Sequence, residues 1–242
     1  MIDCPETNPT DSPRDPGRVR EMFGKISGPY DCINRLFSCW VDLWWRHCLV
    51  SDVRRAHPEL VLDLATGSGD VALLLERKGM KTIGLDFCLP MLEQSRRKGF
   101  GRLAAGDALK MPFQENTFDA VTIAFGFRNF ADYPAGLREI RRVLKPGGRL
   151  LILEFTDPAA WFRPVYYFYL SRIMPVLAGW ISRNGAAYNY LASSVQKFPT
   201  ASSLGIQMES EGYRDVGWRK LAPGIVAIHR GEKSPCLEDK EF

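Results

Sequence analysis

The 242-residue sequence contains no run of about 18 uncharged apolar residues, the length that a membrane-spanning helix requires. Its basic residues are not concentrated in any segment, and the formal net charge is only +4, from 32 basic and 28 acidic residues. Both absences have consequences for function. We expect no membrane span and no nucleic-acid-binding surface, because the latter requires clustered positive charge.

The six cysteines form no metal-binding or disulfide pattern, since none belongs to a CxxC pair or lies near a group of histidines. We therefore expect no zinc or other metal and a reducing, cytoplasmic environment. Residues 1–17 contain four prolines and predict a disordered leader, with no secretory signal. Residues 18–231 predict a single α/β domain, followed by a loose tail from Glu232.

The segment from Glu59 to Asp86 is the most informative part of the sequence. It predicts a buried strand at Leu60–Leu64, a tight Gly67-Ser68-Gly69 turn, a helix starting near Asp70 and a second strand that ends on Asp86. Asp86 lies 19 positions after Gly67, close to the separation at which a carboxylate reaches a ribose diol in a βαβ unit. This unit predicts a crevice for a nucleoside-containing cofactor.

The charge beside the turn discriminates between cofactors. The Gly67-x-Gly69-x-x-Ala72 spacing satisfies a loose dinucleotide fingerprint, which would suit NAD. Asp63 and Asp70, however, would place carboxylates where a pyrophosphate must bind, whereas the same carboxylates would suit a cation. S-adenosylmethionine carries a sulfonium and an ammonium and has no phosphate, so it fits better. The simplest alternative is a glycine turn that only joins a strand to a helix.

Two further strands end on polar residues. Leu103–Ala105 predicts a third strand that leads into Asp107, whose carboxylate could accept from an adenine amine or could simply cap a turn. The apolar segment that begins at Ala108 would then face the adenine ring. Phe118–Phe125 predicts a fourth strand, and the Arg128-Asn129 pair follows it between aromatic residues, at the sheet edge where open α/β folds bind ligands.

The remaining elements complete an α/β pattern. Asp132 is expected to cap a helix that runs to Leu144, and Arg149–Phe155 predicts a fifth strand. Val216–Leu221 and Ile225–His229 predict a closing hairpin.

Two stretches are rich in aromatic residues. A helix through Leu36, Phe37, Trp40, Leu43, Trp44 and Trp45 is expected to pack in the core, while the preceding Tyr30 and Asn34 could line a pocket or bond to the turn. Residues 159–181 are dense in aromatics but interrupted by Arg and Pro, so they predict an amphipathic lid over residues 159–198 or a surface that rests on a membrane. An ordinary buried helix pair is the alternative.

From about Val19 to Gly231 the chain resembles the ubiquinone/menaquinone biosynthesis C-methyltransferases. Four signatures carry the resemblance, and the first and third are the more specific. They are Tyr30-Asp31-x-Ile33-Asn34 with Ser38, Asp42 and Trp45-Arg46; Leu64-Ala65-Thr66-Gly67-Ser68-Gly69-Asp70; Phe125-Gly126-Phe127-Arg128-Asn129; and Arg142-Val143-Leu144-Lys145-Pro146-Gly147-Gly148 through Glu154.

The resemblance implies a Rossmann-like class I methyltransferase fold, with a seven-stranded, mostly parallel sheet, helices on both faces and an N-terminal helical cap. It implies S-adenosylmethionine as the cofactor and a polyprenylated quinol as the substrate, either demethylmenaquinol or a methoxy-benzoquinol precursor of ubiquinone. Contact with a membrane surface and a homodimer are further expectations. With the residues singled out above, the expected cofactor site comprises Asp63, Thr66, Gly67, Gly69, Asp86, Asp107, Ala108 and Ala124.

The expected catalytic residues are Arg128, Asn129 and Tyr30. Arg128 would stabilise a phenolate, Asn129 would orient a ring hydroxyl, and Tyr30 or a water molecule would relay the proton. Three other classes remain open: a methyltransferase that acts on oxygen or nitrogen of another small molecule, a non-catalytic lipid-binding or assembly subunit, and an NAD dehydrogenase. The dehydrogenase is disfavoured because all three histidines fall outside the expected ligand-binding loops.

Overall fold

The computed structural model describes residues 15–26, 31, 34–35, 38–158, 160–169, 172, 194–222 and 224–234. The elements of these residues are α1 (Pro16–Ile26), α3 (Val41–Arg54), β1 (Leu60–Leu64), α4 (Asp70–Arg77), β2 (Lys81–Asp86), α5 (Leu89–Arg97), β3 (Leu103–Ala105), β4 (Phe118–Ala124), η2 (Phe127–Asn129), α6 (Tyr133–Val143), β5 (Leu144–Phe155), α7 (Arg163–Phe168), α10 (Ala201–Ser210), β6 (Tyr213–Leu221) and β7 (Val226–Lys233).

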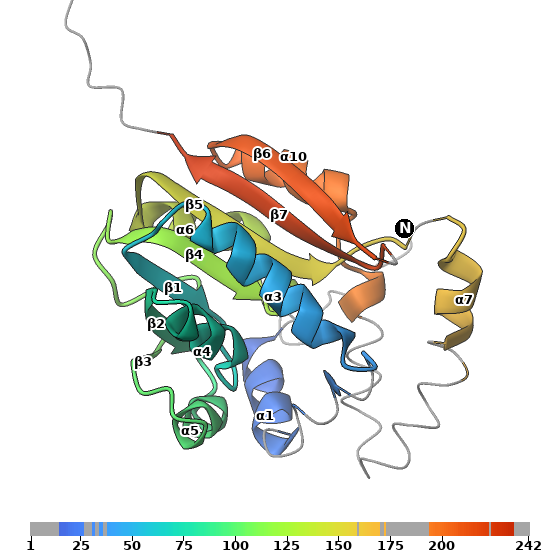
Figure 1. The fold of residues 1–242 in the computed structure, drawn as a ribbon, viewed down its shortest axis with the longest axis horizontal. Coiled ribbons are helices and arrows are strands. Elements are labelled where there is room, and N and C mark those ends of the chain that lie inside the picture. The colour runs from blue at the N-terminus through green and yellow to red at the C-terminus, as the bar shows by residue number, and fades with distance from the viewer. Residues whose placement is uncertain are drawn as a thin grey trace, which may run out of the picture.

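The strands form one seven-stranded sheet in the order β3-β2-β1-β4-β5-β7-β6 (Figure 1). The strands from β3 to β5 in this order pair in parallel, whereas β7 runs antiparallel to both β5 and β6. The predicted mostly parallel sheet and the closing hairpin are therefore confirmed. Since β1 lies between β2 and β4, the loops after these strands meet at one edge of the sheet.

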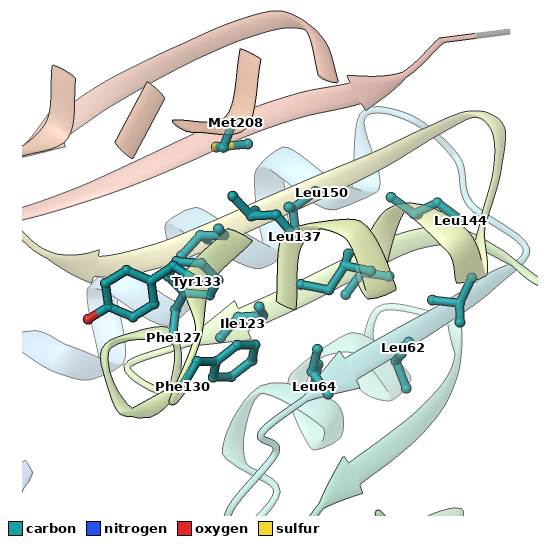
Figure 2. Packing of buried hydrophobic residues seen from close by; sticks show 14 of the residues in the cluster. Leu62, Leu64, Ile123, Phe127, Phe130, Tyr133, Leu137, Leu144, Leu150 and Met208 are labelled. Atoms are coloured by element: carbon teal, nitrogen blue, oxygen red, sulfur yellow. The ribbon is translucent and has the colours of Figure 1, made fainter. Parts of the chain in front are cut away.

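Helices cover both faces of the sheet, because side chains of a strand alternate between its two faces. Val61 of β1 belongs to a buried cluster with Leu49 of α3 and Leu75 of α4. The next residue, Leu62, belongs to the opposite cluster with residues of α6 and α10, including Leu137. Figure 2 shows this second cluster between α6 and the strands. The prediction of helices on both faces is confirmed.

The start of α6 follows the sequence expectation. Asp132 is its N-cap, and its carboxylate accepts a hydrogen bond from the backbone N–H of Ala135 at 2.9 Å. This bond satisfies one of the amide groups that a helix leaves unpaired at its N-terminus.

The aromatic helix predicted through residues 36–45 differs from the structure. Helix α3 begins only at Val41, after Trp40 in a left-handed conformation, and continues to Arg54; Leu36 and Phe37 lie outside the described residues. Trp45 is buried as expected, but the prediction of core packing is wrong for Trp40 and Trp44, which are exposed. Trp44 thus lies on a solvent-exposed face of α3, and Trp40 precedes the helix.

The expected limits of the domain also differ from the structure. Glu232 and Lys233 were expected in a loose tail, yet they pair with β5 and β6 as the end of β7. Lys233 Nζ donates to the backbone carbonyl of Leu144 at 2.7 Å, which anchors the strand end. At the other terminus α1 begins at Pro16, within the expected leader, because a proline fits the first turn of a helix.

His229 on β7 makes stability depend on pH. It is fully buried, its Nε2 donates to the carbonyl of Ala201 at 3.1 Å, and burial lowers its pKa from 6.5 to about 4. In the unfolded chain it takes up a proton below its ordinary pKa, so its stabilising contribution is present above pH 6.5 and is lost as the pH falls toward 4.

The expected size of this effect is roughly 3 kcal/mol of unfolding free energy between pH 7 and pH 4. Urea unfolding of the parent protein and of His229→Gln, which keeps a donor for Ala201, measures it. The difference in stability between the two proteins should shift by this amount in favour of the variant on acidification. A constant difference across this range would contradict the buried neutral imidazole.

Candidate active site

A cavity opens at the sheet edge where β1, β2, β3 and β4 end, and it contains about 880 Å³ of space including its mouth. Its walls come from the loops that follow these four strands and from the N-terminal helix α1. The sequence expectation of a crevice at this edge is confirmed.

The loop after β1 approaches its neighbours closely. Gly67 and Gly69 have φ angles of 55° and 81°, in the left-handed region that favours glycine. A β-carbon at Gly69 would collide with the hydroxyl of Ser95 on α5. A β-carbon at Gly126, after β4, would come within 2.6 Å of the β-carbon of Ala65. The backbones after β1 and β4 therefore lie side by side because glycines allow it.

Asp86 points its carboxylate toward this loop. One oxygen accepts from the backbone N–H of Gly67 at 2.8 Å and the other from that of Cys88 at 2.9 Å. Burial raises the pKa of Asp86, while these hydrogen bonds act in the opposite direction. Each carboxylate oxygen has a second lone-pair site, and Asp86 lines the cavity, so it can also accept from two hydroxyls of a ligand.

Asp63 stabilises the loop after β1 through side-chain hydrogen bonds. It accepts from the hydroxyls of Thr66 at 2.6 Å and Thr122 at 2.8 Å, and it does not line the cavity. Burial raises its pKa to about 6, although both hydroxyl bonds lower it. Asp63 therefore holds Thr66 in place but presents no charge to the cavity. Thr66 itself does not line the cavity either.

Asp70 is also balanced by other side chains of the protein. It accepts from Lys98 Nζ at 2.6 Å and pairs with Arg35 at 3.4 Å. Asp63 and Asp70 both lie beside the turn as expected, but each is bonded to other side chains and neither lines the cavity. Their distant partners in the sequence could not be foreseen from the local pattern.

The other expected cofactor residues divide in two groups. Gly67, Asp107, Ala108 and Ala124 line the cavity together with Asp86, whereas Gly69 does not. Asp107 accepts from the backbone N–H of Leu109 at 2.9 Å, as a turn cap would, and still faces the cavity. The turn-cap interpretation of Asp107 is therefore confirmed, and its bond to an adenine amine stays a prediction.

Arg128 and Asn129 point to different places. Asn129 lines the cavity. Arg128 is 5% exposed, and its guanidinium binds the fully buried carboxylate of Glu154 at 2.9 Å. The guanidinium lies 5.4 Å from the centre of the Phe155 ring. Arg128 is not among the residues that line the cavity. It also donates to the carbonyl of Phe125. The structure therefore does not bring the Arg128 guanidinium to the cavity with Asn129.

Aromatic residues fix η2 in this position. The rings of Phe127 and Tyr133 stack at a centroid distance of 5.0 Å, and Phe130 packs on Phe127 at 4.9 Å (Figure 2). The hydroxyl of Tyr133 donates to the carbonyl of Arg128 at 3.2 Å. These contacts hold the backbone at Asn129 in place beside the cavity. Tyr30 lies outside the described residues.

Sequence reasoning missed several residues of the site. Arg20 and Phe23 of α1 line the cavity, and the Arg20 guanidinium lies 5.4 Å from the centre of the Phe87 ring. Nothing in the local pattern of α1 indicates this contact. Glu154 enters the sequence analysis only as the end of the fourth signature, without a role. An acidic residue inside the apolar run of β5 could have indicated a buried ion pair.

The strand order, the antiparallel β7 and the cavity at the ends of β1 to β4 define a Rossmann-like methyltransferase fold. A solved structure with this fold is a SAM-dependent methyltransferase, possible histamine N-methyltransferase, from Thermotoga maritima. It has a TM-score of 0.63 and 16% identity, with 88% of this chain and 99% of that chain covered.

The sequence defines the family more narrowly. The model of the ubiE/COQ5 methyltransferase family matches residues 12–233, and the chain belongs to this family. A demethylmenaquinone methyltransferase of Thermus thermophilus is 46% identical over 88% of this chain and 100% of that protein. A ubiquinone/menaquinone biosynthesis C-methyltransferase of Geobacter sulfurreducens is 43% identical over 89% of this chain and 88% of that protein. The chain is therefore an enzyme, a methyltransferase.

Proposed function

We propose that this enzyme transfers a methyl group from S-adenosylmethionine to a ring carbon of a polyprenylated quinol, and that demethylmenaquinol is its substrate. The full-length similarity to the Thermus thermophilus protein carries this proposal. The methoxy-benzoquinol precursor of ubiquinone is the second candidate, because the Geobacter sulfurreducens relative is named for both pathways.

The described residues fit the proposed cofactor. Asp86 has acceptor sites for two ribose hydroxyls, and the turn at Gly67 brings backbone close to the same space. Ala108 and Leu109 offer an apolar surface for the adenine ring, beside Asp107 as an acceptor for its amine. When bound, S-adenosylmethionine supplies an electrophilic methyl group on a sulfonium.

The protein must then make the quinol carbon nucleophilic. A phenol-like hydroxyl has a pKa of about 10, so only about one molecule in a thousand is ionised at pH 7, a gap of roughly 4 kcal/mol. We assign the hydrogen bond to the developing phenolate oxygen to the side-chain amide of Asn129, which lines the cavity. Tyr30 is the proposed proton relay, and Arg128 the residue that positions η2.

Asn129→Ala tests this assignment. We expect kcat for quinol methylation to fall by about 10- to 100-fold, because a hydrogen bond that strengthens on ionisation of the substrate is lost. The affinity for S-adenosylhomocysteine, measured by calorimetry, should stay within about threefold of the parent value, since the bond forms only in the reaction. Equal loss of binding and turnover would place Asn129 in the cofactor site instead.

The apolar surface around α7 is the proposed contact for the prenyl tail and for the membrane from which the tail emerges. Trp161 is 73% exposed, and Val165 and Phe168 on α7 are exposed as well, with Arg163 beside them. Within the described residues no helix combines the length and the apolarity that crossing a bilayer requires. Aromatic residues with nearby positive charge suit the interface of an anionic membrane.

Trp161→Ser combined with Phe168→Ser should weaken binding to phosphatidylglycerol vesicles by about tenfold or more, since burial of each large apolar side chain contributes about 1.5–3 kcal/mol. Cosedimentation measures the binding. Ile206→Ser is the matched control, because Ile206 is 65% exposed on α10, away from α7 in Figure 1. Equal effects of the double variant and the control would contradict a membrane contact at α7.

A substrate competition tests the function itself. Equal concentrations of reduced demethylmenaquinone and the methoxy-benzoquinol precursor are incubated with labelled S-adenosylmethionine and the enzyme. We expect label mainly in menaquinol. Label mainly in the other quinol would support the second candidate, and label in neither would contradict the proposed substrate class.

A further inference from the structure

Lys98, at the C-terminal end of α5, joins three parts of the chain. Its Nζ donates to the hydroxyl of Ser68 at 2.9 Å and to the carboxylate of Asp70 at 2.6 Å, both in the loop and helix start after β1. It also forms an ion pair with Asp31, in the N-terminal segment. All three donor positions of the ammonium group therefore have acceptors.

Asp31 and Arg35 complete the network from the N-terminal side. The hydroxyl of Ser68 donates to Asp31 at 2.6 Å, and Arg35 pairs with Asp70 at 3.4 Å. Two cations and two anions from distant parts of the sequence thus interlock. We call Lys98, Asp31, Ser68, Asp70 and Arg35 the Lys98 network.

The burial of this network makes it more than a set of surface pairs. The side chains of Lys98, Asp31 and Asp70 are only 26%, 21% and 17% exposed. Burial would raise the pKa of Asp70, but the hydrogen bond from Lys98 and the charges of Arg46, Lys98 and Arg35 outweigh it, so the pKa is lowered. Charge-assisted hydrogen bonds of this kind are stronger than neutral ones.

The network lies between two functional segments. Ser68 and Asp70 flank Gly69 in the loop whose Gly67 lines the cavity and bonds to Asp86. Asp31 directly follows Tyr30 in the sequence. Lys98 itself is not among the residues that line the cavity.

We propose that Lys98 is a positioning residue for methyl transfer: through Asp31 it fixes the segment that carries Tyr30 against the cofactor loop. The inference rests on the proposed function for its kinetic part. Lys98 acts on the reaction through Asp31 and Ser68 and not through contact with the reacting groups. Asp31 and the cofactor loop are thereby held in a fixed relative position.

Lys98→Met tests this role, since methionine keeps much of the side-chain length and volume and removes the charge. Lys98→Arg is the conservative variant, and Lys78→Met, an exposed lysine at the end of α4, is the matched control. Three quantities are measured on each full-length protein: kcat for the quinol, the dissociation constant of S-adenosylhomocysteine, and hydrogen exchange of the peptides that contain Asp31 and Ser68.

We expect Lys98→Met to lower kcat by about tenfold or more, because small misplacements of a reacting group have large effects on rate. Exchange of both peptides should rise by about tenfold as the local structure opens more often. The affinity for S-adenosylhomocysteine should stay within about threefold of the parent, because a loss confined to the reaction leaves ground-state binding unchanged. Lys98→Arg should restore most of kcat, and Lys78→Met should match the parent.

A double variant shows whether Lys98 acts through Asp31. Lys98→Met with Asp31→Asn should lower kcat no more than Lys98→Met alone, whereas additive losses would show independent roles and overturn the proposal. Unchanged exchange and kcat in Lys98→Met would overturn it as well. If the parent enzyme fails to methylate the quinol, the proposed function fails, while the exchange measurement still decides whether Lys98 ties the two segments together.

Discussion

Asp86→Ala should weaken the binding of S-adenosylhomocysteine by about 100-fold or more. The carboxylate offers acceptors for two ribose hydroxyls, and each hydrogen bond to a charged group contributes about 1.5–3 kcal/mol. The same substitution removes the acceptors for the N–H groups of Gly67 and Cys88, so the turn that faces the ligand loses its anchor. Both consequences act on the same site.

Calorimetric titration measures this loss. The fold should survive the substitution, because burial raises the pKa of Asp86, which means that its charged form is disfavoured in the folded protein. Asp52→Ala is a matched control, since Asp52 lies on α3 and pairs with Arg55 and Arg219 away from the cavity. Parent-like affinity in Asp86→Ala would show that the nucleoside binds elsewhere.

The second large effect concerns the buried ion pair. Arg128→Met should lower the free energy of unfolding by about 3–5 kcal/mol, because the carboxylate of Glu154, with no exposed surface, would lose its cationic partner. Replacement of both residues by Arg128→Met with Glu154→Leu should recover most of that loss, since no buried charge remains. Urea unfolding of the three proteins measures both changes. Parent-like stability of Arg128→Met would contradict the buried pair.

The activity of the double variant then assigns the role of Arg128. If Arg128 positions η2, as its contacts with Glu154 and Phe125 indicate, the stable double variant should retain measurable quinol methylation. A stable double variant that binds S-adenosylhomocysteine but has lost methylation would favour direct stabilisation of the phenolate. The urea unfolding curve of the double variant is the control that shows that this variant is folded.

The sheet could be predicted from sequence because its signals are local. Apolar runs such as Leu60–Leu64 fix the strands, glycines at positive φ fix the turns, and a strand that ends on Asp86 marks the ligand edge. Register and neighbouring loops then follow from the general geometry of parallel sheets. This is why the sequence alone predicts Asp86, Asp107 and Asn129 at the edge of the sheet where the cavity lies.

The orientation of charged side chains could not be predicted in the same way. From the sequence alone Arg128 resembles a substrate contact, but in the fold it binds Glu154 of β5. Asp70 looks like an anion beside the ligand until Lys98 reaches it from α5. In both cases the deciding partner is more than 20 positions away in the chain, and its reach depends on tertiary packing.

The prediction that the aromatic residues near α3 are all buried was wrong for a related reason. The aromatic stretch of residues 36–45 has enough apolar residues for a core helix, but of its three tryptophans only Trp45 is buried against the sheet. The residues of α1 in the cavity, Arg20 and Phe23, depend on how α1 packs against α5, which the sequence of neither helix encodes alone.

The most direct measurement is the fate of the methyl group. The enzyme is incubated with S-adenosylmethionine that carries a trideuterated methyl and with reduced demethylmenaquinone, and the product is analysed by mass spectrometry and carbon NMR. The account predicts one trideuterated methyl on the ring carbon that carried hydrogen. Label on an oxygen of the quinol, or an unlabelled quinol in the presence of enzyme that binds S-adenosylhomocysteine, would contradict it.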